Sequence, residues 1–574
     1  MFALIIISLI FAPLAFAAVE PWAFVPLYAL YFLGAAAVYA KGENTHPNPL
    51  YKNLLPAVLA VAAIGALQAL TQAPINGPAH LLFTTWRLST ANAVMLWLFY
   101  AAVMYCAAKA IKTPAQLTGL LWTIFGLGVI VALMGTLQRA EDNTLVYGLR
   151  RVAGYAFGPF VNRDHGAFFL AMAGMCGLGL FFGGFRPIFA HQSHTKMFDL
   201  LAIQFLKLVM VVAIIAGIIK TGSRGGLNAF VFAAAFMGFA ASGSLRKKAH
   251  KIAAWSALIF LLAGYGYILS ENRILLGLKG DKFDNSVAVR FSLYKSSWAM
   301  LKDFPVFGTG LGAVEHAFPH YARPDLGSKA LVRHVHSDWI ELFLQVGVAG
   351  GLLYLAGLFI ALFAYYKAWA RCHSFTIKAV YGGALGAALA GMLHSFVDFG
   401  LQMPANALAF YALLGALASK PAVEGRRRQP HEEEEEPEPV PPRKLYANAA
   451  AVLAMLLAVA AVPQAVSWYY ALPPGGKADA ALKWQPGPQA AFRLGAEYYN
   501  KGLKDKQAPC AVFRNANALT WPYLRQAPVN DGLNLLAGNL RLQLANCYNR
   551  PLTLKNPPKN PLPAAPPTSN SSRP

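Results

Sequence analysis

Apolar segments of about 20 residues recur along most of this chain, and they constrain its fold more than any other feature. A helix of that length is long enough to cross the hydrocarbon core of a lipid bilayer. In addition, 56% of the 574 residues are hydrophobic and the mean hydropathy is +0.42, which is too apolar for a soluble protein of this size. The pattern predicts an all-α, polytopic membrane protein with about 13 transmembrane helices. The predicted spans are residues 2–18, 19–40, 52–71, 92–111, 116–137, 165–184, 200–220, 226–242, 252–269, 340–366, 376–397, 403–419 and 446–466.

The first segment has a second interpretation, because the small residues between Ala15 and Ala18 resemble a signal-peptide cleavage site. A signal peptide carries Lys or Arg before its apolar stretch, and this sequence has none there. We therefore expect the first segment to be retained as a membrane span.

Clusters of Lys and Arg between the spans indicate how the chain is oriented. All of them fall on one side of the predicted membrane, at residues 109–112, 246–251, 367–378 and 426–428. Loops rich in Lys and Arg stay in the cytoplasm, so we expect the N-terminus to be inside. The outer side then holds residues 138–164, 220–226, 270–339 and the tail after 466.

The net charge of +23 raises the alternative of nucleic-acid binding. Basic inner loops explain much of this charge, because membrane insertion and anionic lipid headgroups both favour them. The sequence shows no soluble module with interleaved basic and aromatic residues, so we expect no nucleic-acid partner. Residues 270–337 on the outer side also carry nine Lys and Arg against six Asp and Glu. Topology rules do not require that excess, which therefore indicates an anionic ligand.

Changes in composition divide the chain into consecutive parts. In order, they are N-terminal transmembrane helices (1–150), a membrane core with a large outer loop (151–419, loop 270–339), a disordered cytoplasmic linker (420–445), a last transmembrane helix (446–466) and an outer tail that is partly helical and then disordered (467–574). The linker is assigned from its acidic run and its prolines. Cys510 and Cys547 both lie in the tail, and they would pair only in an oxidising compartment.

Within the outer loop, an amphipathic helix is predicted from Arg290 to Asp303, and Pro305 ends it. Helical spacing gathers apolar and aromatic side chains on one face, namely Phe291, Tyr294, Trp298 and Leu301. Such a face is typical of helices that lie in the membrane interface. The glycine-rich stretch that follows, 307–312, lacks the Lys-Ser or Lys-Thr of a phosphate-binding P-loop, so we expect turns there.

Two arginines on the outer side are candidate anion-binding residues. Arg224 lies in a short glycine-flanked turn between two spans, and Arg290 begins the amphipathic helix. A guanidinium group offers two parallel N–H donors to a phosphate, and flanking glycines let the phosphate approach the backbone. The alternative is that each arginine is an ordinary charge at the end of a helix.

His336 is the candidate catalytic residue, because an imidazole titrates near neutral pH and can accept a proton from a hydroxyl group. It lies where the outer loop meets the next span, and Ser337 and Asp338 after it are typical helix-start residues. The positive end of that helix would favour an anionic substrate. The alternative is a structural histidine at a helix cap.

His394 and Asp398 are candidate supporting residues, as are Ser337 and Asp338. His394 and Asp398 lie near the outer ends of two later spans. A histidine and an aspartate at a membrane boundary either bond each other in a structural role or line a polar cavity.

A metal site is the competing interpretation of the histidines in the outer loop, which are His316, His320, His334 and His336. Pro319 disrupts the helical spacing of the first pair, and a His-x-His pair alone is not specific. We therefore expect no metal.

The spacing around His336 resembles the motif of a known membrane protein family. His336 and Ser337, nine further residues, Gly347, two residues and Gly350 fit the pattern of the O-antigen ligase and polymerase superfamily. Thr-Gly-Ser-Arg-Gly-Gly at 221–226 strengthens this match, and 157–165 also looks like a family segment. The resemblance covers roughly residues 150–420.

This resemblance implies a metal-independent glycosyltransferase without a cofactor, in the bacterial inner membrane and with its active site facing the periplasm. Such enzymes transfer a glycan from polyprenyl (undecaprenyl) diphosphate to an acceptor hydroxyl in surface polysaccharide or lipopolysaccharide biosynthesis. Carried over to this sequence, Arg224 and Arg290 would bind the donor diphosphate, and His336 would activate the acceptor. The implied partners are the lipid-linked glycan, an acceptor glycan or lipid, and membrane lipids.

Several alternatives stay open. A polysaccharide polymerase or a protein O-oligosaccharyltransferase of the same superfamily differs from a ligase in its acceptor, and the linker and tail are not typical of a lipid A–core ligase. A lipid-linked glycan transporter would instead hold ionisable groups near the middle of the membrane, where Lys207 is the clearest charge. A non-enzymatic assembly scaffold would depend on the linker and the tail.

Overall fold

The computed structural model describes residues 1–41, 50–73, 82–140, 145–151, 156–185, 194–242, 259, 263–264, 281–323, 326, 332–418, 444–470, 488–504, 512–514, 516–517, 536, 539–540 and 543. Some of the predictions fall outside these residues. They are nearly all of the span 252–269, almost the whole linker, and the cysteines Cys510 and Cys547.

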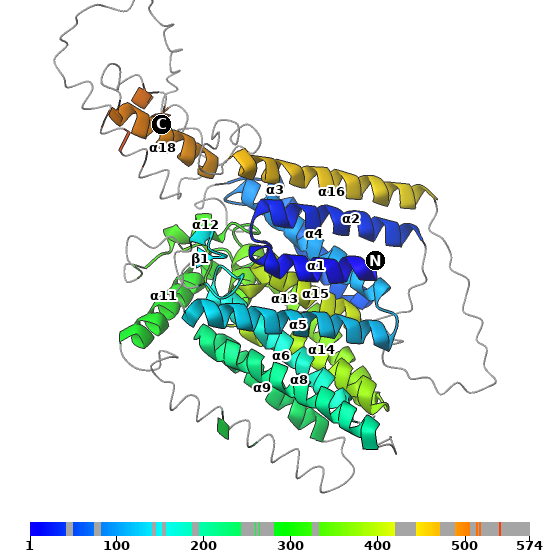
Figure 1. Cartoon of the computed structure of the whole chain (residues 1–574). Coiled ribbons are helices and arrows are strands. Elements are labelled where there is room, and N and C mark those ends of the chain that lie inside the picture. The colour runs from blue at the N-terminus through cyan, green and yellow to red at the C-terminus, as the bar shows by residue number, and fades with distance from the viewer. Residues whose placement is uncertain are drawn as a thin grey trace, which may run out of the picture.

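Long helices that run side by side form one bundle (Figure 1). They are α1 (Phe2–Leu14), α2 (Pro21–Ala40), α3 (Leu55–Leu70), α4 (Arg87–Ala110), α5 (Pro114–Ala140), α6 (Arg163–Gly183), α8 (His194–Thr221), α9 (Arg224–Ser242), α13 (Asp338–Arg371), α14 (Phe375–His394), α15 (Pro404–Leu417) and α16 (Lys444–Tyr470). Beyond one end of this bundle lie α11 (Asp281–Asp303), α12 (Val314–Ala317) and α18 (Pro488–Lys504). The remaining elements are short, namely the helical turns Phe16–Ala18, Leu50–Leu54, Phe318–His320 and Gly400–Gln402, and the antiparallel pair β1 (Leu145–Val146) and β2 (Arg150–Arg151).

The predicted fold class, an all-α polytopic membrane protein, is confirmed. Among the described residues, 10 helices are long and apolar enough to cross a membrane. The helices α1 and α15 are apolar but shorter, and they coincide with the predicted spans 2–18 and 403–419. Together these helices account for every predicted span except 252–269, so the expected number of 13 is neither reached nor contradicted by the described residues.

The first span is well packed. Helix α1 contacts α5 and α15, and the junction that follows it, Ala17 and Ala18, is buried. This packing fits the retained span expected from the sequence.

Helix α6 lies inside the bundle and brings two distant segments to the same end. In the most apolar 18-residue stretch of α6, 83% of the residues are buried. It packs against α14 through Gly179 and Gly383, where a Cβ on either glycine would lie 2.6–2.7 Å from the Cα of the other. Small residues let two membrane helices approach this closely. Arg163 at the start of α6 and His394 at the end of α14 consequently lie at the same end of the bundle.

Helix α13 is broken at Gly347, whose φ of 68° lies in the left-handed region that favours glycine. Part of the outer loop re-enters the bundle and pairs with the backbone at this break. Val348 N donates a hydrogen bond to Pro305 O at 2.7 Å, and Thr309 N donates to Leu344 O at 2.9 Å. The loop therefore supplies hydrogen-bond partners to backbone groups of α13 on both sides of the break.

Gln68 of α3 fastens the same re-entrant stretch. Its side-chain amide donates to Phe307 O at 2.7 Å and to Gln345 O at 3.0 Å. Its carbonyl oxygen accepts from Leu311 N at 2.9 Å. The glycine-rich stretch consists of turns, as expected, and positive φ angles occur at Gly308, Gly310 and Gly312.

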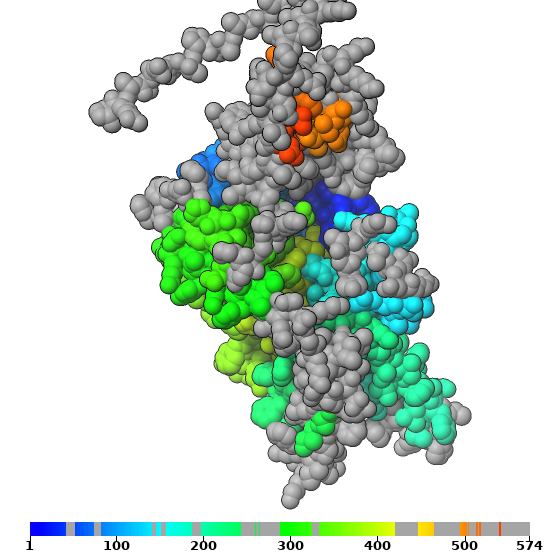
Figure 2. All heavy atoms as spheres, turned by 90° about the vertical axis from the view of Figure 1, so that its left-hand side faces the viewer, coloured from blue at the N-terminus to red at the C-terminus, as the bar shows by residue number. Residues whose placement is uncertain are grey.

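Helix α11 is the predicted amphipathic helix, although it begins earlier than predicted. Leu293 and Met300 are buried in a small hydrophobic core of the outer loop. Of the predicted aromatic face, Phe291 and Trp298 are 59% and 60% exposed, whereas Tyr294 and Leu301 are partly buried and pack against that core. Figure 2 looks at this end of the molecule and shows the described loop residues, in green, gathered in one patch. The location of the aromatic face in the membrane interface stays a prediction.

Candidate functional site

Arg224 occupies the first turn of α9, directly after the tight turn that ends α8. Gly222 in that turn has a φ of +68°, which favours glycine, and Ser223 Oγ accepts from Gly226 N at 3.4 Å. A Cβ at Gly226 would lie 2.5 Å from the side chain of Ala167, so α9 closely approaches the beginning of α6. The turn thereby fixes Arg224, partly buried, at the end of the bundle.

The buried side chain and backbone N–H of Asp338 tie the start of α13 to the turn that follows α14. Asp338 N donates to Ser395 O and to Asp398 O, each at 3.0 Å. Asp338 Oδ2 accepts from Ser395 Oγ at 2.9 Å and from Leu401 N at 3.0 Å. Ser337 caps α13 by accepting a backbone N–H of the first turn. Both Ser337 and Asp338 are buried, and they hold the backbone beside the site.

His336 precedes this junction and has an unusual backbone conformation. Its φ is 55°, in the left-handed region that a residue other than glycine adopts rarely. Such a conformation costs about 1–3 kcal/mol and persists only where the surroundings enforce it. Here Val335 N donates to Glu341 Oε2 at 3.2 Å, and the hydroxyl of Tyr294 donates to His336 O at 3.3 Å. Strain held in place in this way is typical of functional sites.

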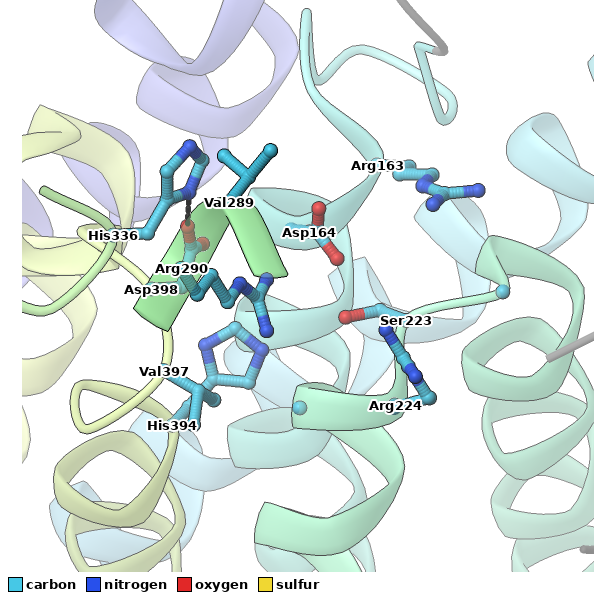
Figure 3. Close-up of a pocket in the computed structure, with 12 residues that line it drawn as sticks. Arg163, Asp164, Ser223, Arg224, Val289, Arg290, His336, His394, Val397 and Asp398 are labelled. Carbon is cyan, nitrogen blue, oxygen red and sulfur yellow. Dashed lines mark ion pairs between the residues drawn. The ribbon is translucent and has the colours of Figure 1, made fainter. Parts of the chain in front are cut away.

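These segments surround one cavity of about 350 Å³ (Figure 3). Arg224, Arg290 and His336 all line it, from α9, α11 and the segment before α13. The full lining is Arg163, Asp164, Gly222, Ser223, Arg224, Gly225, Val289, Arg290, His336, His394, Val397 and Asp398. Of the candidate supporting residues, His394 and Asp398 are among them and Ser337 and Asp338 are not. One basic cavity is therefore lined by five of the seven sequence-predicted residues, namely Arg224, Arg290, His336, His394 and Asp398, while their chemical roles stay predictions.

Asp398 lies at the centre of a group of histidines. Its carboxylate is 2% exposed and lies 3.6 Å from His336 Nδ1 and 3.7 Å from His165 Nε2. Burial alone would raise the pKa of Asp398, but His165, His336 and His394 together lower the pKa below its usual value. Asp398 is therefore ionised at neutral pH.

Sequence reasoning assigned no role to the residues that begin α6, although the structure brings them to the site. Asn162 caps the helix by accepting from Asp164 N at 2.9 Å. Arg163 and Asp164 line the cavity, and His165 is 3% exposed beside Asp398. The available signal was a helix-capping Asn followed at once by two charges and a histidine at the predicted outer end of a span.

The loop histidines considered for a metal site differ in their contacts, although His334 and His336 both lie against the ring of Phe399. The ring of His316 stacks on Trp86 with 4.4 Å between ring centroids, His334 Nδ1 lies 2.9 Å from Glu341 Oε1, and His336 faces the cavity. Within the part of the chain that the structure describes, no three His, Cys, Asp or Glu side chains are grouped to hold a metal ion.

Lys207, the mid-span charge considered for a transporter, caps a neighbouring helix. Its Nζ donates to Leu180 O at 3.3 Å, and Gln204 Nε2 donates to Phe181 O at 2.7 Å. These carbonyls belong to the end of α6, and Phe181 O also accepts from the backbone N–H of Gly184 at 3.2 Å. The contact accounts for the charge without a transport path.

Fold and site together define a multi-pass, all-α membrane protein with a basic cavity at one end of its helix bundle, lined by two histidines and three arginines. Residues 209–355 match the family model of the O-antigen ligase. That segment contains Arg224, Arg290, His336 and both glycines of the motif, and the match confirms the resemblance to the O-antigen ligase and polymerase superfamily. No curated protein matches the chain significantly.

Proposed function

We propose that this protein transfers a glycan from polyprenyl (undecaprenyl) diphosphate to an acceptor hydroxyl during the biosynthesis of a surface polysaccharide or lipopolysaccharide. The observation that carries the proposal is the cavity shared by Arg224, Arg290 and His336. All three residues belong to the segment that matches the O-antigen ligase model. The charge distribution of the loops supports a site on the periplasmic side of the inner membrane.

In this proposal the arginines act on the leaving group. Negative charge grows on the diphosphate oxygens as the bond between the anomeric carbon and oxygen breaks. Arg224 and Arg290 line the cavity from two different elements, so they approach a bound diphosphate from two directions. Fixed donors of this kind stabilise developing charge strongly where water is partly excluded.

His336 acts as the general base. The acceptor hydroxyl gives its proton to the imidazole, its oxygen bonds to the anomeric carbon, and polyprenyl diphosphate leaves with the electron pair of the broken bond. His336 Nδ1 faces Asp398, which leaves Nε2 for the acceptor. The buried negative charge of Asp398 stabilises the imidazolium that forms. Direct displacement of this kind inverts the anomeric centre.

The test is transfer in proteoliposomes that contain the full-length protein and undecaprenyl diphosphate-linked glycan. Lipid A–core, a free glycan chain and an acceptor protein are offered separately, so the product distinguishes ligase, polymerase and oligosaccharyltransferase. We expect His336→Ala, Arg224→Ala and Arg290→Ala each to lower kcat by roughly 100-fold or more. His320→Ala is the matched control, because His320 is an exposed histidine of the same loop that does not line the cavity.

Two outcomes would contradict the proposal. Full transfer by His336→Ala would remove the assigned base. Movement of intact glycan lipid across the bilayer, with no new glycosidic bond to any acceptor, would support the transporter instead.

A further inference from the structure

His394 is a fully buried residue of the cavity wall that the reaction described above does not use. It is the last residue of α14, its exposure is 0%, and it lines the cavity beside Val397 and Asp398. Phe168 covers one side of its ring, edge to face, with 5.1 Å between ring centroids. The ring is therefore fixed between an apolar neighbour and the cavity.

Neither ring nitrogen of His394 has a hydrogen-bond partner among the described residues. A buried polar group without a partner is costly, and native structures satisfy nearly all such groups. The cavity is the space into which His394 can direct a nitrogen. Figure 3 shows its imidazole close to the side chain of Arg290, on the wall that faces the beginning of α9.

Gly225 keeps the space between His394 and α9 open. A Cβ at position 225 would lie 3.2 Å from His394 Nε2 and 2.8 Å from the side chain of Val397. Gly225 also belongs to the first turn of α9, a helix of 19 residues whose N-terminal end favours an anion. The helix end, the guanidinium of Arg224 and the Nε2 edge of His394 thus surround the same part of the cavity.

We infer that His394 donates a hydrogen bond from Nε2 to a phosphate oxygen of the donor diphosphate, in a subsite formed with the first turn of α9. The inference rests on the proposed function for the identity of the ligand. A neutral imidazole supplies this bond without transferring a proton, so His394 binds the leaving phosphate while His336 handles the proton of the acceptor. Because the bond strengthens as charge grows on the phosphate, His394 contributes to catalysis as well as to binding.

The test measures the binding of inorganic pyrophosphate to the full-length protein in detergent, together with its inhibition of glycan transfer. His394→Leu removes the donor, and His394→Gln offers an amide N–H near the position of Nε2. We expect His394→Leu to weaken pyrophosphate binding by about tenfold or more, and His394→Gln to restore most of it. His316→Leu is the control, because His316 is partly buried by Trp86 and lies outside the cavity.

Thermal unfolding separates this inference from a purely structural role. Because neither ring nitrogen of His394 has a hydrogen-bond partner among the described residues, His394→Leu should unfold at the same temperature as the unaltered protein or higher, whereas loss of a structural hydrogen bond would lower it. Unchanged pyrophosphate affinity in His394→Leu would overturn the inference and leave the proposed transfer reaction standing. Conversely, pyrophosphate binding that depends on His394 in a protein that transfers no glycan would retain the subsite and reject the reaction.

Discussion

His336 Nδ1 lies 3.6 Å from Asp398 Oδ1, although two membrane helices, α13 and α14, separate these residues in the sequence. The backbone of Asp338 fixes this distance, because it donates to the carbonyl of Asp398 and directly follows the His336-Ser337 pair. The side chain of His336 is 38% exposed and that of Asp398 is 2% exposed. One edge of the imidazole is therefore held by a buried charge while the rest of the ring is accessible from the cavity.

We predict that Asp398→Asn lowers kcat with little change in KM for the donor lipid. The substitution keeps the shape of the side chain and removes the charge that stabilises the imidazolium. Loss of an opposite charge at this distance destabilises the imidazolium by about 1.5–3 kcal/mol, which corresponds to a decrease of roughly 10-fold to 100-fold in kcat. Steady-state kinetics in proteoliposomes provide the measurement.

Asp303→Asn is the matched control for that prediction. Asp303 is an outer-loop carboxylate that accepts from the hydroxyl of Tyr321 and does not line the cavity. Its substitution should leave kcat unchanged. If Asp398→Asn also left kcat unchanged, the negative charge of Asp398 would have no part in the action of His336.

We predict that Gly347→Ala destabilises the protein by about 2 kcal/mol or more. At a φ of 68° a Cβ is strained, and here it would also overlap the backbone carbonyl of Val306 in the re-entrant loop. The expected result is a lower unfolding temperature in detergent and faster proteolysis of the outer loop. Gly126→Ala in α5 is the control, since a Cβ there would meet no described residue outside its own helix turn within 4 Å. An unaltered unfolding temperature for Gly347→Ala would contradict the described break in α13.

The sequence was sufficient to predict the membrane helices, for a physical reason. A bilayer requires an apolar segment of nearly constant length with its backbone groups paired internally, so hydropathy alone locates the spans that the structure describes. The break at Gly347 could not be predicted in this way. Nothing in the local sequence distinguishes a glycine at which a helix breaks and pairs with a loop from a glycine that only lets two helices pack closely.

Arg224, Arg290 and His336 were predicted to act together, because their residue types suit one reaction and the family motif joins them. Arg163 was not predicted to belong to this group, because a charge at the end of a span is usually an ordinary boundary residue. Its place in the cavity depends on the contact of α6 with α14 at Gly179 and Gly383. Such a contact is a property of the three-dimensional packing and leaves no pattern within either helix.

We predict that Lys207→Met retains full glycan transfer. Lys207 Nζ donates to the carbonyl of Leu180 at the end of α6, far along the bundle from the cavity. The variant should lose only a modest amount of stability, about 1 kcal/mol for one hydrogen bond. Transfer assays and unfolding temperatures measured on the same preparation test both parts. A complete loss of transfer in a folded Lys207→Met protein would contradict this prediction and would support the transporter, in which a charge in the membrane interior is functional.

We predict that the pair of His334 and Glu341 makes stability fall as the pH rises above neutral. Burial opposes the charged form of His334, but Glu341 at 2.9 Å outweighs it and raises the pKa of His334, and Glu315 and Asp398 act in the same direction from farther away. A histidine whose pKa is raised on folding contributes its full stabilisation below the unfolded pKa of about 6.5. That stabilisation is lost as the pH rises through the folded-state pKa.

The unfolding temperature of the purified protein should therefore decrease as the pH rises above neutral, and this decrease should be smaller in His334→Gln. His316→Gln is the control: burial lowers the pKa of His316 to about 4, so His316 is neutral in both the folded and the unfolded protein over this range. Its variant should keep the pH dependence of the unaltered protein. If the decrease were the same in His334→Gln as in the unaltered protein, Glu341 would hold a neutral His334, and the hydrogen bond between them would not require a charged ring.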